Sequence, residues 1–365
     1  MLDTVTIRLR QKKYKINDHS NFSPSTEGFY VSPYVRMGSR GYIDAYNNFK
    51  SKNSKYYPQL TARKRIVKGG FEIFLLIQLS VPKLLHNNNF DEIDNDDFEN
   101  IVFTLFQRLN EMGVITNPKC IESAEVIKVH FGKNIILSNG ILVPIVLNEL
   151  HKVDFSLIYD LQDKDYRNGG KMVRIHCKSF ELAFYDKKKD MLKDKKEGKK
   201  GNNIQTSLFD VVAKNIQVLR IEARLNNKQK INRDLGDLIF KDLFIGSKSK
   251  NYLQKEWDKV EQGYKLLNAK IPDYESFYAK ASLVKGSKIT TIQSVYTFLE
   301  ANRTMGVRNY RNLIETRYSK RTWYSQVKQA KKYINNVDVP DFITAIRNQL
   351  KEFEKVQYGD YRFLI

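Results

Sequence analysis

Cysteine is scarce in this chain, and long apolar runs are missing from it. Two cysteines, Cys120 and Cys177, are too few for a disulfide framework or a structural zinc site. The first residues, MLDTVTIRLR, lack the apolar block of a signal peptide. No apolar stretch is long enough for a transmembrane helix. The sequence therefore predicts a soluble, cytoplasmic protein with reduced thiols and no membrane partner.

Acidic residues are too few to balance the basic ones. The chain has 62 Lys and Arg against 41 Asp and Glu, which gives a formal net charge of +21. A surplus of this size on a folded chain favours a polyanionic partner. Nucleic acid is the first candidate and an anionic membrane surface is the second. Charge alone does not distinguish between them.

Strand and helix patterns alternate until about residue 227, and the remainder is helical. Strand patterns cover 4–10, 71–80, 123–131, 171–187 (one long strand or a hairpin) and 216–225. Helical patterns cover 94–113 and 141–153, and residues 11–66 are expected to form short strands and loops. We therefore expect an α+β fold. A domain over 1–240 would have an antiparallel-rich sheet with helices on one face, and an all-helical domain would follow over 250–365.

Three of these strands each place titratable side chains on one face. Alternation puts His130 with Lys128, Tyr185 opposite Leu182 and Phe184, and Glu222 with Arg220 and Arg224. If the strands are neighbours, His130, Tyr185 and Glu222 would share an open polar surface. A tyrosine can attack phosphorus, while an imidazole and a carboxylate can hold a divalent metal. An ordinary half-exposed antiparallel sheet with surface charges would show the same pattern, and both interpretations stay open.

Four blocks in order resemble the phage and plasmid rolling-circle replication initiators typified by the filamentous-phage replication protein. The blocks are LSVPKLLHNNNFDE (79–92), VIKVHFGKN (126–134), FELAFYDKKKD (180–190) and VLRIEARL (218–225). The resemblance spans about residues 1–230. It implies a nuclease domain of the HUH nicking class that cleaves one origin strand through a tyrosine and Mg²⁺ or Mn²⁺. A 5′-phosphotyrosine and a free 3′-OH would result, inside a bacterial host cell.

Carried over by position, the resemblance assigns the site residues. Tyr185 would be the nucleophile, Lys187 or Lys188 would orient the scissile phosphate, and His130 and Glu222 would bind the metal. The class uses a His-hydrophobe-His pair, whereas this chain has Lys128-Val129-His130 and Arg174-Ile175-His176. His176 is a second metal candidate. It lies nine residues before Tyr185, so a turn or bulge at 177–179 is needed to bring both to one face.

The C-terminal part carries a local surplus of Lys and Arg. Helices are expected over about 290–304, 307–316 and from Thr322, in the rhythm of a helix-turn-helix module. Trp323 could stack on bases or pack internally. Besides Trp323, Arg220, Arg224 and Lys128, the candidate DNA-binding residues here are Arg308, Arg311, Arg317, Lys320, Arg321 and Lys328. An ordinary helical bundle with solvated lysines is the alternative. The lysine run 187–200 is either a solvated segment or part of a path for single-stranded DNA.

Two functional interpretations of the sequence stay open. The first is a replication initiator whose partners are double-stranded and single-stranded origin DNA, with a host helicase and polymerase, and whose oligomeric state is open. The second is a DNA-binding protein or repressor on a nuclease scaffold that has lost its chemistry. A tyrosine recombinase is set aside, because none of the five histidines has an arginine three residues later.

Overall fold

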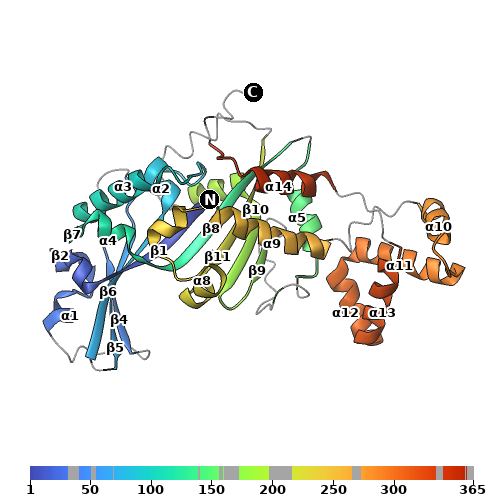
Figure 1. Ribbon diagram of the computed structural model, residues 1–365, viewed down its shortest axis with the longest axis horizontal. Coiled ribbons are helices and arrows are strands. Elements are labelled where there is room, and N and C mark those ends of the chain that lie inside the picture. The colour runs from blue at the N-terminus through green and yellow to red at the C-terminus, as the bar shows by residue number, and fades with distance from the viewer. Residues whose placement is uncertain are drawn as a thin grey trace.

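The protein is an α+β molecule built on one large antiparallel sheet (Figure 1). The computed structural model describes residues 1–31, 41–50, 55–68, 70–138, 140–155, 159, 172–196, 216–264, 273–333, 340–357 and 359. Nine strands follow the order β3-β4-β5-β6-β1-β8-β11-β10-β9, and each neighbouring pair runs antiparallel. A separate two-stranded sheet pairs β2 with β7. The expected α+β class and antiparallel sheet are confirmed.

The elements have the following bounds. The strands are β1 (Leu2–Arg10), β2 (Lys15–Ile16), β3 (Phe22–Ser23), β4 (Tyr42–Asn47), β5 (Gln59–Val67), β6 (Gly70–Ser80), β7 (Val114–Ile115), β8 (Glu125–Leu137), β9 (Met172–His176), β10 (Phe180–Asp186) and β11 (Gln217–Leu225). The main helices are α1 (Glu27–Val31), α2 (Val81–His86), α3 (Phe98–Glu111), α4 (Pro118–Glu122), α5 (Val143–His151), α6 (Lys187–Lys196), α8 (Lys228–Leu235), α9 (Lys248–Tyr264), α10 (Tyr274–Ser282), α11 (Ile289–Met305), α12 (Val307–Arg317), α13 (Lys320–Lys331) and α14 (Asp341–Glu352).

The expected strands and helices are present with small shifts at their ends. Within the segment 171–187, β9 and β10 form a hairpin and are joined by a turn at 177–179. The region 11–66 is more regular than expected, because β4 and β5 are ordinary strands of the main sheet. Tyr and β-branched residues lie among the basic ones in these two strands, and such side chains fit a pleated sheet.

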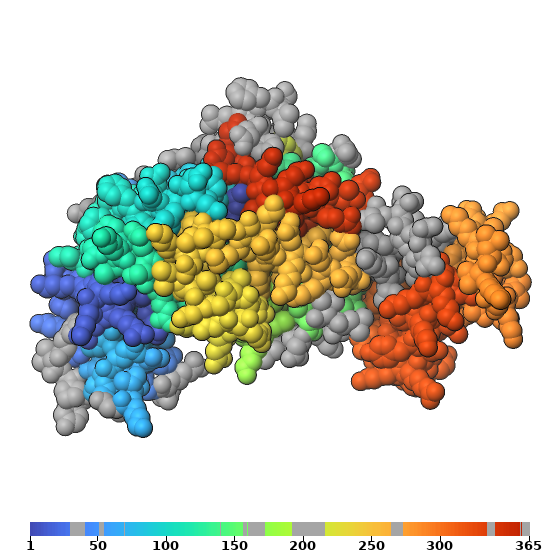
Figure 2. Space-filling view, viewed as in Figure 1, coloured from blue at the N-terminus to red at the C-terminus, as the bar shows by residue number. Residues whose placement is uncertain are grey.

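One face of the sheet carries the main core. Leu182, Phe184 and Ile221 are buried there, and the Phe184 ring lies 6.1 Å from Trp257 of α9, centroid to centroid. On α9, the buried residues Leu253, Trp257 and Val260 recur at helical spacing, so that one stripe faces the strands. Helices α5, α8 and α9 pack against β8 to β11, and Figure 2 shows α8, α9 and α14 in front of the sheet.

The opposite face is also covered in part, by helix α6. Its Met191 packs with Val218 of β11, which by alternation lies on the same side as Arg220 and Glu222. The expected arrangement, with helices on one face, therefore holds for α5, α8 and α9 but not for α6. Because α6 begins directly after β10, its first residues lie beside the polar side chains of that face.

The helices that follow α9 fall into two groups, and α10 contacts α11 of the second group. Helix α14 packs on α9 and β8, and the Gln349 side chain hydrogen-bonds both the N–H and the C=O of Ile136, at 2.8 and 2.7 Å. Helices α11, α12 and α13 instead contact one another around buried Trp323, at one end of the molecule (Figure 1). The division into 1–240 and 250–365 stays a prediction. Among the described helices, none is long and apolar enough to cross a membrane.

Candidate functional site

Strand pairing brings the three principal site candidates to one face of the sheet. β11 lies between β8 and β10, so Arg224 pairs with His130 on one side, while Arg220 pairs with Tyr185 on the other. Directly paired residues in antiparallel strands point to the same face. Glu222, two residues from each arginine, therefore lies between His130 and Tyr185. The expected common face is present.

That face is closed rather than open. Glu222 is 3% exposed, Arg220 3% and Tyr185 8%, so the expected open surface is wrong. Ion pairs and α6 account for the closure, because charged side chains can be buried when each finds a partner. His130 and Arg224 keep 20% and 28% of their side chains exposed. They form the solvent-facing edge of the site.

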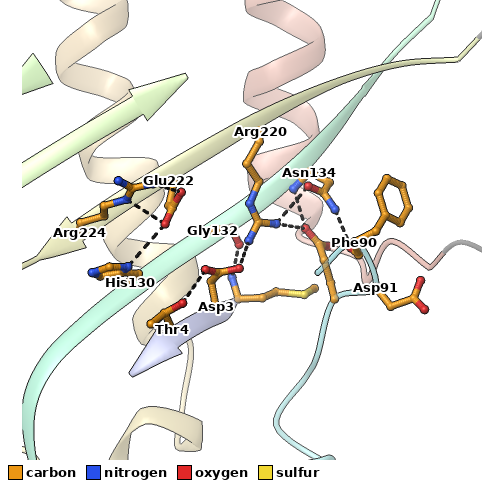
Figure 3. Close-up of polar contacts among 12 residues, drawn as sticks. Asp3, Thr4, Phe90, Asp91, His130, Gly132, Asn134, Arg220, Glu222 and Arg224 are labelled. Carbon is orange, nitrogen blue, oxygen red and sulfur yellow. Dashed lines mark hydrogen bonds and ion pairs between the residues drawn. The ribbon is translucent and has the colours of Figure 1, made fainter. Parts of the chain in front are cut away.

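Three possible metal ligands converge at this edge: Asp3, His130 and Glu222 (Figure 3). They come from three adjacent strands, β1, β8 and β11, and one ligand atom of each lies within 4.8 Å of the others. Sequence reasoning missed Asp3, since simple alternation groups it with buried Val5 and Ile7. The pairing of β1 with β8 shifts register between Leu2 and Thr4, which marks an irregularity at Asp3.

This donor set fits a divalent cation of the Mg²⁺ or Mn²⁺ type. Carboxylates suit both ions, and an imidazole nitrogen shifts the preference towards Mn²⁺. The carboxylates also accept from arginines: Asp3 from Arg220 Nη2 at 2.7 Å, and Glu222 from Arg224 Nε at 2.9 Å and Nη2 at 2.8 Å. A carboxylate has about four lone-pair positions. On Glu222, Arg224 and the Tyr185 hydroxyl take three of them, so the position on Oε1 that faces His130 is the one left for a metal.

Tyr185 is held against this cluster. Its hydroxyl donates to Glu222 Oε2 at 3.1 Å. Burial, together with the negative charge of Glu222, raises the pKa of Tyr185 well above its ordinary value. Burial alone would raise the pKa of Glu222, but hydrogen bonding to His130 and the Arg224 charge hold it well below its usual range. The pair is therefore a neutral phenol facing a carboxylate anion.

Arg220 reaches the cluster by crossing β8 over Gly132 (Figure 3). Its guanidinium donates to Asn134 Oδ1 at 3.0 Å as well as to Asp3, and Glu92 lies 3.6 Å away. A Cβ at Gly132 would lie 2.5 Å from Cζ of Arg220. The Arg220 side chain is therefore buried and positions Asp3, and its expected contact with DNA stays a prediction. Arg224 bridges Glu181 and Glu222, whereas Lys128 is exposed.

The remaining candidates near the tyrosine divide between buried and exposed positions. The turn at 177–179 does bring His176 to the Tyr185 face, where its Nδ1 lies 3.4 Å from Glu181 Oε2, outside the metal cluster. Lys187 is 2% exposed, and burial followed by the Arg220 charge lowers its pKa to about 8. Lys188 is partly exposed. The lysine run 187–200 begins as helix α6, and its residues 197–200 lie outside the described part.

The helical candidates also divide into two groups. Trp323 is 1% exposed and packs against Phe298 and Tyr310, which is the internal packing that the sequence left open beside stacking on bases. Arg311 pairs with buried Asp154 at 3.0 Å and with Glu315 at 2.8 Å, and thereby joins α12 to the segment after α5. Arg308 is partly exposed, and the exposed cations are Arg317, Lys320, Arg321 and Lys328.

The helix boundaries expected in this basic region are confirmed by α11, α12 and α13. Comparison with protein-family models, with curated proteins and with solved structures gives no match for the chain. The candidate site is therefore argued from its own geometry.

Metal binding can be measured directly on the cluster. We expect the chain to bind Mn²⁺, and Asp3→Asn or His130→Ala to weaken that binding by about 10- to 100-fold or more, because each removes a ligand atom. Electron paramagnetic resonance of free Mn²⁺ provides the readout. His176→Ala is the matched control, since His176 lies on the same face but outside the cluster. Equal Mn²⁺ affinity in Asp3→Asn and wild type would rule out this ligand set.

Proposed function

We propose that the chain is a metal-dependent DNA nicking and joining endonuclease that initiates rolling-circle replication. The observation that carries this proposal is the 3.1 Å contact of the Tyr185 hydroxyl with Glu222, a residue that also converges with Asp3 and His130. A nucleophile, a metal-binding set and buried cations then lie in one place. The four sequence blocks that resemble rolling-circle initiators support the same assignment.

The proposed chemistry is a transesterification at phosphorus. Tyr185 Oη forms a bond to the scissile phosphorus while the bond from phosphorus to the 3′-oxygen breaks. The phenolic proton leaves to solvent at the edge formed by His130 and Arg224, and the departing 3′-oxygen takes a proton from solvent. The products are a 5′-phosphotyrosine and a 3′-OH. Attack by a 3′-OH on the phosphotyrosine reverses the step and joins a strand.

Positive charge around Tyr185 would offset the negative charges of the phosphate and of Glu222. Asp3, His130 and Glu222 would hold a divalent cation, which would polarise the phosphate and offset the Glu222 charge that raises the Tyr185 pKa. Arg224, at the solvent-facing edge, supplies positive charge for the phosphate oxygens, and the buried ammonium of Lys187 adds to the positive field of the site. In the structure described, the carboxylates pair with arginines, so substrate and metal must compete with those ion pairs.

The assay that tests this function looks for a covalent product. Labelled single-stranded oligonucleotides that carry candidate origin sequences are incubated with the protein and Mn²⁺ or Mg²⁺, then separated on a denaturing gel. Label that migrates with the protein in the presence of metal, and not with EDTA, is the expected result. Cleavage without label on the protein would point to hydrolysis and contradict a tyrosine nucleophile.

A non-catalytic DNA-binding protein or repressor is the second candidate. The observation in its favour is that Asp3 and Glu222 already have arginine partners and Tyr185 is only 8% exposed. In that case the exposed cations on α12 and α13 would bind DNA by contacting duplex phosphates, and exposed Tyr318 and Tyr324 lie next to them. DNA binding that is insensitive to chelators, with no adduct on any oligonucleotide, would favour this function.

The pH dependence of oligonucleotide binding tests the role of Lys187. Its folded-state pKa is about 8, so the ammonium is charged below that value and becomes neutral above it. We expect affinity for a single-stranded oligonucleotide in EDTA to fall as the pH rises through about 8, since the phosphate then loses a cation. Fluorescence anisotropy measures this.

Two conservative variants sharpen the test of Lys187. Lys187→Arg keeps its charge at these pH values and should flatten the dependence. Lys188→Arg, at the next and partly exposed position, should leave it as in wild type. If Lys187→Arg retains the wild-type profile, another group titrates.

A further inference from the structure

The face of the sheet that carries the candidate site continues beyond it over β6, β5 and β4. Row by row, the pairing runs from His130 through Thr4 of β1 to Ser80 of β6. The next row runs from Lys128 through Thr6 and Gln78 to Gln59 of β5. Because paired residues share a face, all of these side chains lie on the Tyr185 side of the sheet.

The third row ends on an exposed aromatic residue. Arg8 pairs with Leu76, Leu76 with Thr61, and Thr61 with Tyr46 of β4. Tyr46 is 57% exposed, and Gln59, Gln78 and Lys128 are exposed as well. We call Tyr46, Gln59, Gln78 and Lys128 the sheet platform. An ordinary solvated outer face does not account for the exposed aromatic ring of Tyr46, the largest side chain of the platform.

The composition of the sheet platform suits single-stranded nucleic acid. An exposed ring stacks on any base, amide side chains hydrogen-bond base edges, and one cation meets the backbone. Two neighbouring cations are paired, Arg63 with Asp44 and Arg8 with Glu125, whereas Arg10, the next residue on this face of β1, is exposed. A duplex would require denser positive charge, of the kind that α12 and α13 expose. The geometry therefore favours a single strand on the sheet.

We propose that the sheet platform binds the single-stranded DNA that flanks the cleavage point, with Tyr46 stacking on a base. This inference rests on the proposed function, which places the scissile phosphate at Tyr185. Four strand spacings of about 4.8 Å separate β8 from β4, so the platform extends about 19 Å from the metal cluster. That reach suits a site of about four or more nucleotides. The strand would run from the cluster past Lys128 and the glutamines to Tyr46.

Binding without chemistry tests this proposal. The probe is fluorescent oligothymidylate of 20 nucleotides in EDTA, measured by anisotropy. Tyr46→Ala should weaken binding about tenfold, because it removes one stacking partner. Tyr46→Phe should bind like wild type, since the ring remains. Tyr278→Ala is the matched control: that tyrosine is also exposed, but it lies on α10, away from the sheet. Equal affinity of Tyr46→Ala and wild type would overturn the proposal.

If a variant fails to fold, a second measurement on the wild-type protein still tests the proposal. Oligonucleotides containing 5-bromodeoxyuridine are photo-crosslinked to the wild-type protein, and the attached peptide is identified. A crosslink in the peptide containing Tyr46 supports the proposal, and crosslinks confined to α12 and α13 contradict it.

The salt dependence of binding isolates the contribution of Lys128. Lys128→Gln should lower the slope of log affinity against log salt concentration by about 0.7, the value for one phosphate of a single strand. Lys119→Gln is the control, because Lys119 is exposed on α4. A slope unchanged in Lys128→Gln would overturn the phosphate contact.

The outcomes separate this proposal from the proposed function. If Tyr46→Ala loses binding while no oligonucleotide forms an adduct, the platform stands and the nicking function fails. If the adduct forms with metal while Tyr46→Ala binds and reacts as wild type, the nicking function stands and the platform fails.

Discussion

A chain with Tyr185→Phe will form no covalent adduct with single-stranded DNA, although it will still bind DNA and metal. The substitution removes the attacking oxygen and leaves the ring in place, so the rate of adduct formation should fall by about 10³-fold or more. One buried hydrogen bond, from the hydroxyl to Glu222, is lost as well. That loss costs about 1–2 kcal/mol, which a domain of this size tolerates. Labelled oligonucleotide on a denaturing gel is the measurement.

Tyr159→Phe is the matched control for this variant. The Tyr159 hydroxyl donates to Glu256 Oε2 of α9 at 2.9 Å, so it is also a phenol paired with a buried carboxylate. Its partner helix lies on the other face of the sheet from Tyr185. Tyr159→Phe should therefore form the adduct at the wild-type rate. An adduct in Tyr185→Phe, or its absence in Tyr159→Phe alone, would show that the nucleophile has been assigned wrongly.

Gly132→Ala will disrupt the candidate site by displacing the guanidinium group of Arg220. The new Cβ would overlap the guanidinium group, which has no free space because it is buried and bonded to Asp3 and Asn134. Displacing the guanidinium leaves Asp3 without its buried partner, and breaking such a pair costs about 3 kcal/mol or more. We expect the free energy of unfolding to fall by about this amount in urea denaturation, and Mn²⁺ affinity to fall with it, because Asp3 is no longer positioned.

Two further variants identify the cause of that loss. In an Arg220→Ala background, adding Gly132→Ala should cost little, since the atoms it would overlap are gone. Gly28→Ala is the control for a general effect of replacing glycine: nothing lies within 4 Å of a Cβ placed there, and Gly28 is in helix α1. That change should be neutral or stabilising by up to about 1 kcal/mol. If the losses of unfolding free energy in Gly132→Ala and Arg220→Ala add fully in the double variant, the close approach of Gly132 and the Arg220 guanidinium is contradicted.

Local patterns were sufficient to predict several parts of this protein. Alternation along single strands correctly placed His130, Tyr185 and Glu222 on one face, because successive strand side chains point to opposite sides. Helical spacing and Gly306 correctly marked α11 and α12. These predictions succeeded because a residue's direction within one regular element depends on its immediate neighbours.

Alternation failed wherever the backbone departs from regularity. Asp3 escaped notice because a register shift in β1 places it on the side that simple counting excludes. The odd spacing of His176 from Tyr185 places the two residues on opposite faces of an unbroken strand, whereas a turn separates β9 from β10 and brings them to one face. Neither break leaves a clear mark in the sequence, although the paired strands of the folded sheet show both.

The sequence by itself determined the α+β class, the helical C-terminal part, the cationic surplus and the side of each strand on which a titratable group lies. Only the tertiary structure decided which of those groups meet, that their surface is closed by ion pairs and α6, and that Trp323 is core rather than surface. The physical reason is the difference in range, along the chain, of the interactions involved. Side-chain direction follows from local backbone geometry, whereas burial and ion pairing depend on strands that are neighbours in the sheet but distant in the chain, such as β1, β8 and β11.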